Sequence, residues 1–401
     1  MLRLTNLTRV AALGAVVALA ACSDKKELLG PSTPVGGDIF KSYVAIGNSI
    51  TAGFQSNGIM DATQRQSYAF LLAGQMGTQY HYAALFGRGC TPPIVNGLTG
   101  ALYANAPAGT CDLRTPSSVT DLLNNVAVPG ARVLDPTSST SPASNALTTF
   151  ILGGKTQAQR ALDANPTFVT IWIGNNDVLQ PALSGLYQPI VSTQAQFQTA
   201  YDAMIQQLLN GEQDLKGVLI AVAMAQNLPS VSTGALLFAS PQARGAINAA
   251  TGKTVVIDAS CNGSTSLVNI PSIILAIRGG TYPVVIACAK GIYPAPVGDV
   301  YVLDPAEQVT LTGAINAYND YIKTKAAAIG FAYYDPNVLF AASRASGAIP
   351  AFPNFASTTA TYGLLISLDG VHPTGAAHKL IANELIGVIN AKYGTSLQLV
   401  P

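Results

Sequence analysis

A hydroxyl, an imidazole and a carboxylate occur in this sequence in a pattern that suits ester hydrolysis. Ser49 lies in the segment Gly47-Asn48-Ser49-Ile50-Thr51-Ala52-Gly53, and the sequence Asp369-Gly370-Val371-His372-Pro373 lies near the C-terminus. A serine hydroxyl is a poor nucleophile until a neighbouring base takes its proton, and a neutral imidazole can be that base near pH 7. A carboxylate at the other ring nitrogen fixes the imidazole tautomer. Because the Asp-x-x-His spacing lets both side chains meet in one tight turn, we expect a triad of Ser49, His372 and Asp369.

Hydrogen-bond donors for a negatively charged intermediate can also be identified. The tetrahedral intermediate of ester hydrolysis carries an oxyanion, which needs preorganised donors. Gly130 lies in Pro129-Gly130-Ala131, and Asn176 lies in Gly174-Asn175-Asn176-Asp177. The backbone N–H groups of Ser49 and Gly130 and the side-chain amide of Asn176 can supply those donors. Taken singly, Asn176 could be a turn residue and Asp177 a helix N-cap, so the prediction depends on all blocks together.

The small number of histidines limits the metal sites and the alternative bases that the chain can offer. The chain has three histidines, His81, His372 and His378, so a multi-histidine metal site is nearly excluded, and we expect neither a metal nor a cofactor. His378 lies inside a helical pattern and His81 in the aromatic stretch Tyr80-His81-Tyr82. We expect both to be packing or surface residues, which leaves His372 as the base.

Alternating short apolar runs and helical patterns predict the elements that position these residues. The expected strands are Tyr43–Ile46, Asn125–Val128, Phe168–Ile173, Val218–Ala223 and Ala332–Tyr334. The expected helices are Tyr68–Met76, Thr156–Ala164, Gln194–Leu209, Ala306–Ala328 and Gly375–Tyr393. Apolar runs without alternation suit buried strands of a parallel sheet, and strands that alternate with helices predict an α/β fold with helices on both faces. Ligands bind outside the carboxyl ends of such strands, where the glycine, serine and asparagine segments stand.

The blocks and their order resemble the SGNH or GDSL hydrolase family. The blocks of that family are a Gly-Asp-Ser start, a later glycine, Gly-x-Asn-Asp and Asp-x-x-His, and this chain matches them in order with Ser49, Gly130, Asn176 and His372. The resemblance spans the chain from about residue 41 to the C-terminus. One departure is visible, because Asn48 stands where the first block usually has aspartate.

The resemblance implies a fold and an activity. The fold is a flavodoxin-like three-layer α/β/α sandwich around a five-stranded parallel sheet. The activity is that of an esterase or lipase, acting through a Ser-His-Asp triad and an acyl-enzyme on a lipid, a small ester or an acylated glycan. Two alternatives stay open: deacetylation of, or acyl transfer to, a polysaccharide, and a surface-binding lipoprotein whose triad is idle.

Composition favours a folded chain that does not bind nucleic acid. Of the 401 residues 49% are hydrophobic and 10% are charged, against a usual charged share of about 25%. Such a chain can bury a large core. With 21 basic and 20 acidic residues the net charge is +1, so the electrostatic footprint of a nucleic-acid-binding protein is missing.

The N-terminus is predicted to be a targeting signal. Arg3 and Arg9 precede an apolar run that ends in Leu19-Ala20-Ala21-Cys22. A basic start, a short apolar core and small residues are typical of a secretory signal, and the ending resembles a bacterial lipobox. We therefore expect a lipoprotein signal peptide over residues 1–21, lipidation of Cys22, a flexible tether over 22–40 and the hydrolase domain over 41–401. Because Ser23 follows the cysteine, we expect an outer-membrane location in a Gram-negative bacterium; an ordinary secretory signal is the alternative.

The remaining cysteines predict disulfides in two long excursions. Residues of about 85–124 and 227–301 interrupt the strand–helix alternation and contain Cys90, Cys111, Cys261 and Cys288. Three connectivities are possible, and we favour Cys90–Cys111 and Cys261–Cys288 because each pair lies within one loop-like stretch. The alternative is that one or both pairs stay reduced. Long loops in a compact domain are usually functional and often form walls or lids over a site, and surface decoration is the alternative.

Overall fold

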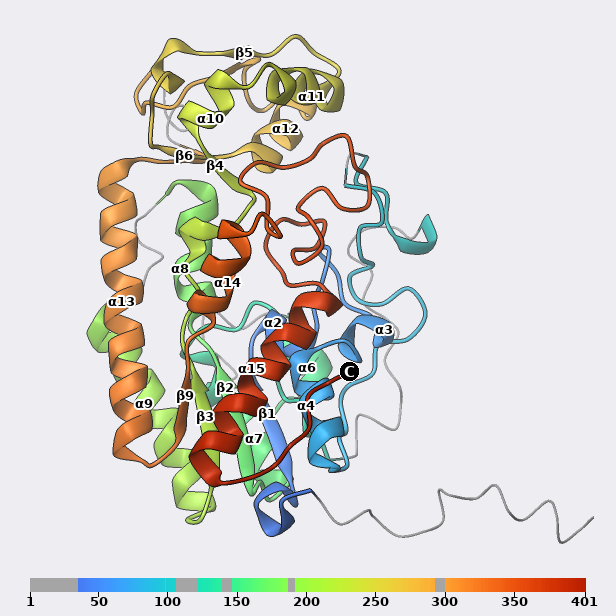
Figure 1. The fold of residues 1–401 in the computed structure, drawn as a ribbon, viewed down its shortest axis with the longest axis vertical. Helices are drawn as coiled ribbons and strands as arrows, with labels where there is room; N and C mark the ends of the chain where they lie inside the picture. The colour runs from blue at the N-terminus through green and yellow to red at the C-terminus, as the bar shows by residue number, and fades with distance from the viewer. Residues whose placement is uncertain (1–34, 98, 106–121, 139–145, 187–191, 293–299) are drawn as a thin grey trace, which may run out of the picture.

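A four-stranded parallel sheet forms the centre of the protein (Figure 1). The computed structural model describes residues 35–97, 99–105, 122–138, 146–186, 192–292 and 300–401. The strand order is β1-β2-β3-β9, and the strands are β1 (Tyr43–Gly47), β2 (Phe168–Trp172), β3 (Lys216–Ile220) and β9 (Ala332–Tyr334). These four correspond to four of the predicted strands, which confirms the parallel α/β fold.

β3 begins and ends earlier than the predicted range of Val218–Ala223. The backbone of Val222 pairs with a side chain instead of a strand, because its N–H donates to Oδ1 of Asn319 at 2.7 Å and its C=O accepts from Nδ2 of Asn319 at 2.9 Å. An apolar run therefore indicates burial correctly but does not show where the strand ladder ends.

The predicted fifth strand, Asn125–Val128, is only partly formed. It lies beside β1, because Val126 N–H donates to Ala45 O at 3.0 Å and Val128 N–H donates to Gly47 O at 3.1 Å. The regular pairing is nevertheless limited to an isolated bridge between Ala45 and Asn125. Asn125 uses its side chain to reach Thr51 O at 2.9 Å, and it forms a second isolated bridge to Tyr82. The segment is therefore extended but is not a regular strand, and the five-stranded count is not confirmed.

Helices cover both faces of the sheet because alternate strand residues point to opposite sides. Val44 and Ile46 belong to one apolar cluster, which includes residues of α7 (Gln157–Asp163), α9 (Gln194–Gly211) and α13 (Pro305–Ala328). Tyr43 and Ala45 belong to a second cluster with α4 (Tyr68–Met76) and α15 (Gly375–Tyr393). These five helices confirm the predicted ones. The described chain also includes α2 (Ser49–Ala52), α3 (Asp61–Gln64), α6 (Ala146–Leu152), α8 (Asn175–Ser184) and α14 (Pro336–Ala345).

Side-chain caps set the starts of the long helices. The hydroxyl of Ser67 accepts the N–H of Phe70 at the start of α4. Asp304 and Glu307 form a reciprocal capping box at the start of α13, with Pro305 in its first turn. Each such cap pairs backbone donors that the helix itself leaves free, and contributes about 1 kcal/mol.

The second excursion is a folded insertion and not the loop that we expected. It contains α10 (Gly234–Ala239), α11 (Pro241–Thr251), α12 (Ile270–Arg278), the short strands β4 (Val231–Thr233), β5 (Val256–Ile257), β6 (Leu267–Asn269) and β7 (Val285–Ile286), and pairs with β8 (Val302–Leu303). The physical reason is an apolar core of its own, to which α12 contributes Ile273 and Ile277. The predicted disulfide Cys261–Cys288 is present inside this core.

The insertion lies at one end of the molecule (Figure 1). α8, which follows the carboxyl end of β2, extends toward it, and Asn269 of the insertion donates to Leu183 O in α8 at 2.8 Å. The insertion is therefore held next to the sheet edge at which a ligand site is expected.

Some predictions fall outside the described residues. These include the signal peptide, Cys22 and most of the tether, as well as Cys111, so the Cys90–Cys111 pair stays a prediction. Cys90 itself is buried. Among the described helices, none combines the length and the apolar character needed to cross a membrane.

Candidate active site

Ser49 stands at the first position of α2, directly after β1. Asn48 caps this helix through its Oδ1, which accepts the N–H of Ile50 at 3.1 Å, while its Nδ2 donates to Oδ1 of Asn175 at 3.3 Å. Asn48 is fully buried, and burying a carboxylate there would be costly. A neutral amide with one accepting and one donating atom fits both partners, which accounts for asparagine where the related pattern has aspartate.

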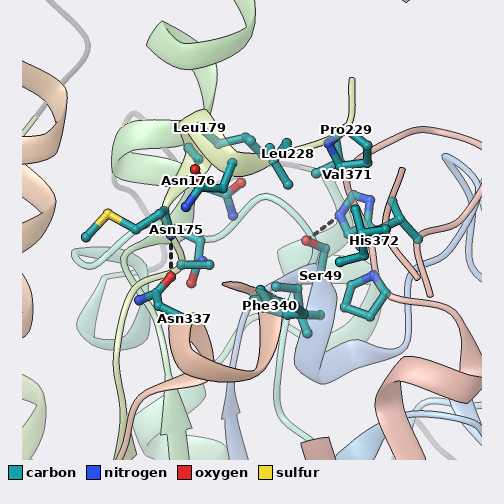
Figure 2. A pocket seen from close by; sticks show the side chains of 18 residues that line it. Ser49, Asn175, Asn176, Leu179, Leu228, Pro229, Asn337, Phe340, Val371 and His372 are labelled. Atoms are coloured by element: carbon teal, nitrogen blue, oxygen red, sulfur yellow. Dashed lines mark hydrogen bonds between the residues drawn. The ribbon is translucent and has the colours of Figure 1, made fainter. Parts of the chain in front are cut away.

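Ser49, His372 and Asp369 form one continuous hydrogen-bonded chain. Nε2 of His372 lies 2.9 Å from Oγ of Ser49, and Nδ1 of His372 lies 2.8 Å from Oδ2 of Asp369. Figure 2 shows the serine and the imidazole pointing toward one another. The side chains are largely buried, with exposed fractions of 13% for His372 and 10% for Asp369. The two residues of the C-terminal block thus reach a serine more than 300 positions away in sequence.

The carboxylate of Asp369 is surrounded by donors. Its Oδ1 accepts the N–H groups of Val371 and His372, both at 2.9 Å, and the hydroxyl of Ser367 at 3.1 Å. Its Oδ2 accepts the N–H of Asn57 at 2.8 Å in addition to the imidazole. Burial alone would raise the pKa of Asp369, but the charge and hydrogen bonds of His372 outweigh it and lower this pKa to about 2. Asp369 is therefore an anion that orients the imidazole, not a proton donor.

A tight turn before α3 holds the loop that contains Asp369, and the sequence analysis did not predict this contact. Ser56 and Asn57 both have positive φ, at 53° and 59°. This left-handed backbone turns the N–H of Ser56 toward Oγ of Ser367 at 2.8 Å and the N–H of Asn57 toward Asp369. The ring of Phe54 packs on the His372 ring with centroids 4.8 Å apart. The Ser-Asn pair in a Gln55–Gly58 turn was a detectable turn signal, but its partner could not be identified from sequence.

Asn176 lies near Ser49 and offers a donor. Its Nδ2 donates to Ala131 O at 2.8 Å, which leaves the second amide hydrogen available because the amide has two. Gly174 precedes α8 with φ of 107°, and a Cβ there would come within 2.7 Å of Phe197. The glycine of Gly-x-Asn-Asp therefore lets the chain turn sharply, so that Asn176 reaches the cavity.

The other two predicted donors are backbone groups. The N–H of Ser49 is at the start of α2, where the helix provides no acceptor for it. Gly130 has φ of 84° and is exposed, next to Ala131, whose carbonyl holds Asn176. It does not line the cavity beside Ser49, so the structure brings Ser49 and Asn176 together and leaves Gly130 adjacent to them.

Asp177 is buried beneath Asn176 and acts as an anchor. Its carboxylate accepts the N–H of Val133 at 2.9 Å and the hydroxyl of Ser192 at 2.6 Å. Burial raises the pKa of Asp177 to about 6 despite these bonds. Because the bonds join α8 to the segment after Gly130 and to the start of α9, Asp177 fixes the backbone that carries Asn176, which is more than an N-cap would do.

The other two histidines lie apart from the reacting groups. His378 is fully buried in α15, where its Nδ1 accepts the N–H of Tyr68 at 3.2 Å, and burial lowers its pKa to about 3. His81 is exposed, and its backbone bonds to Asn124 and Asn125. Both are packing or surface residues, as expected. The described ranges contain no group of three or more histidine, cysteine, aspartate or glutamate side chains that could hold a metal.

A narrow apolar cavity of about 60 Å³ opens beside Ser49 (Figure 2). Asn176 and Leu179 of α8 lie on one side of it, His372 and Pro229 on another, and Phe340 of α14 at its base. Its walls come from segments that follow β1, β2 and β3 and from the loop before α15. The arrangement places a serine hydroxyl, an imidazole and hydrogen-bond donors at one small apolar cavity, a combination that could perform acyl transfer to serine.

Comparison with known proteins assigns the chain to a family. The model of the family described as GDSL-like lipase/acylhydrolase matches residues 43–385. The comparison with curated proteins gives no match. Among solved structures, the chain is similar to an active-site mutant of a family two carbohydrate esterase from Clostridium thermocellum, with 10% identity and a TM-score of 0.37 over 91% of this chain and 66%, just under two thirds, of that one. It is also similar to an acetyl-xylooligosaccharide esterase from Geobacillus, with 12% identity and a TM-score of 0.37 over 89% and 95% of the two chains.

Proposed function

Since the chain belongs to the GDSL-like lipase/acylhydrolase family and is a carboxylic ester hydrolase, we propose that Ser49, His372 and Asp369 carry out the hydrolysis through an acyl-enzyme. The observation that supports this most directly is the unbroken chain of hydrogen bonds from Ser49 Oγ through both ring nitrogens of His372 to Asp369. The nucleophile, the base and the group that orients the base thus already stand at hydrogen-bond distances.

The first half of the reaction forms the acyl-enzyme. Ser49 Oγ attacks the ester carbonyl carbon while its proton passes to Nε2 of His372, whose Nδ1–H stays bonded to Asp369. The carbonyl oxygen becomes an oxyanion, and the N–H group of Ser49 and the amide of Asn176 stabilise it. The C–O bond to the alcohol then breaks, the alcohol oxygen takes the proton from His372, and the acyl group stays on Ser49.

The second half releases the acid. A water molecule gives a proton to His372 and attacks the acyl carbon, and the same donors stabilise the second oxyanion. Collapse of this intermediate returns the proton to Ser49 and frees the carboxylic acid. Atoms balance with water as the sole co-reactant, so this route uses no cofactor.

A fluorophosphonate probe tests this function directly, because such reagents phosphonylate activated serines. We expect the purified protein starting after Cys22 to react with stoichiometry close to one, and peptide mass mapping to place the adduct on Ser49. The same protein should hydrolyse nitrophenyl acetate. A folded protein that neither reacts with the probe nor hydrolyses any nitrophenyl ester would instead favour the binding lipoprotein with an idle triad.

We also propose that the enzyme is exported and anchored through a lipid on Cys22. Support comes from the basic start, the short apolar core and the ending Leu19-Ala20-Ala21-Cys22 of the N-terminal segment. Expressed with its own N-terminus in a Gram-negative host, the protein should incorporate a labelled fatty acid and fractionate with the outer membrane. Cys22→Ser should abolish the label, and a label that persists in this variant would exclude Cys22 as the modified residue.

A further inference from the structure

A second, larger cavity adjoins the triad. It has a volume of about 410 Å³ and is lined by His372 and Asp369 but not by Ser49 or Asn176. The 60 Å³ cavity is lined by Ser49 and Asn176 but not by Asp369. Leu179, Val371 and His372 line both cavities. The imidazole of His372 therefore lies between two cavities of very different volume.

We infer that the large cavity receives the alcohol part of the ester and the small one a short acyl group, so that the substrate is an acetylated or similarly short-chain ester of a bulky hydroxylated alcohol such as a saccharide. This inference rests on the proposed function. It assigns a binding site to the folded insertion, which contributes α12 and part of α11 to the wall of the large cavity.

The direction of proton transfer orients the substrate. His372 takes a proton from Ser49 and must give one to the alcohol oxygen, so that oxygen lies next to Nε2. The oxyanion points to the amide of Asn176, which lies toward α8 in Figure 2, away from the imidazole. The alcohol therefore leaves past His372, where the large cavity begins, and the acyl group stays over Ser49.

The size of the small cavity limits the acyl chain. A volume of about 60 Å³ is only a few times the ~10–15 Å³ that a cavity needs in order to hold one water molecule. Leu228, Phe340 and the buried Ile366 close it with apolar surface. A short acyl group therefore suits this cavity better than the chain of a long fatty acid does.

The large cavity suits an alcohol that carries hydroxyl groups. Its volume lies within the range of about 300–1,000 Å³ that is usual for small-molecule sites. Asn269 and Ser272 of the insertion line it together with the aromatic ring of Tyr362. Apolar side chains such as Ile274 and Phe355 complete the wall, and they can pack on the carbon faces of such an alcohol.

Two series of substrates test the two cavities separately. In nitrophenyl esters with a fixed alcohol, we expect kcat/KM to fall at least 100-fold from acetate to octanoate. In acetates with a varied alcohol, we expect acetylated cellobiose to be hydrolysed with a higher kcat/KM than ethyl acetate. Preference for octanoate, or for ethyl acetate over acetylated cellobiose, overturns the assignment.

A variant that fills the large cavity gives the sharper test. Ser272→Trp places a large ring in the cavity, and should lower the ratio of kcat/KM for acetylated cellobiose to that for ethyl acetate at least tenfold. Gln242→Trp is the matched control, because Gln242 is exposed on the neighbouring α11 and lines neither cavity; it should leave the ratio unchanged. If Ser272→Trp instead penalises long acyl chains selectively, the large cavity holds the acyl group and the inference is wrong.

Binding to an inactive protein separates this inference from the proposed function. Calorimetry with Ser49→Ala protein and acetylated cellobiose needs no turnover. Binding that Ser272→Trp weakens at least tenfold supports the cavity even if hydrolysis by Ser49 were disproved. No binding by a protein whose parent hydrolyses nitrophenyl acetate would overturn the saccharide site and leave the esterase function in place.

Discussion

Ser49→Ala will lower kcat on nitrophenyl acetate by about 10⁴–10⁶-fold, which is the range for loss of the nucleophile in serine triads. The variant keeps His372 and Asp369, but nothing remains to form the acyl-enzyme. Ser49 is 7% exposed and loses a single oxygen, so the fold should not change. The measurement is kcat from initial rates at saturating substrate, with active-site titration of the wild-type protein.

A matched serine outside the site provides the control for this result. Ser346 is exposed after α14 and lines neither cavity, so Ser346→Ala should retain the wild-type kcat. Circular dichroism and thermal unfolding establish that both variants are folded. A folded Ser49→Ala protein with more than a hundredth of the wild-type kcat would remove Ser49 from the mechanism.

Asp369→Asn will lower kcat by about 10⁴-fold, as loss of the triad carboxylate does in other serine enzymes. The carboxylate accepts bonds from Asn57, Ser367, Val371 and two groups of His372. In asparagine an NH₂ group replaces one carboxylate oxygen. This donor then faces N–H groups that the carboxylate oxygen accepted. The imidazole either loses its partner or takes the tautomer with hydrogen on Nε2, in which it cannot accept the proton of Ser49.

The same substitution has a defined effect on stability against pH. The pKa of Asp369 in the folded protein, about 2, lies below its ordinary value of 3.8. The ionised carboxylate therefore stabilises the fold above about pH 4, and this contribution is lost as the pH falls toward 2. A shift of about two units corresponds to about 2–3 kcal/mol. In urea titrations, the free energy of unfolding of Asp369→Asn should fall below that of the wild type by an amount of that order at pH 6, and by less near pH 3.

The exposed Asp320 supplies the comparison for both measurements. Asp320→Asn should change neither kcat nor the pH dependence of unfolding. An Asp369→Asn protein that keeps a tenth or more of wild-type kcat would mean that the imidazole is oriented by other groups, such as the ring contact with Phe54.

Local sequence patterns were enough to predict much of the secondary structure and one part of the candidate site. The Asp-x-x-His spacing places Asp369 and His372 in one turn, since three residues are enough to bring Oδ2 to Nδ1. Apolar runs of strand length identified β1, β2, β3 and β9, and helix periodicity identified α4 and α15 to the residue. These features depend on neighbours in sequence, where backbone geometry and side-chain period are set.

Features that depend on contacts between residues far apart in sequence were decided by the tertiary structure. The turn at Ser56 and Asn57 reaches Asp369 across more than 300 residues, and no local signal states which loop a turn will contact. The second excursion looked like a loop because its strands are two or three residues long, and only packing around Ile273, Ile277 and the Cys261–Cys288 bridge makes it a folded unit. The sequence by itself therefore identified the candidate reacting groups and the class of fold. The volumes on the two sides of His372, which we propose select the ester, follow from long-range packing that residue spacing does not encode.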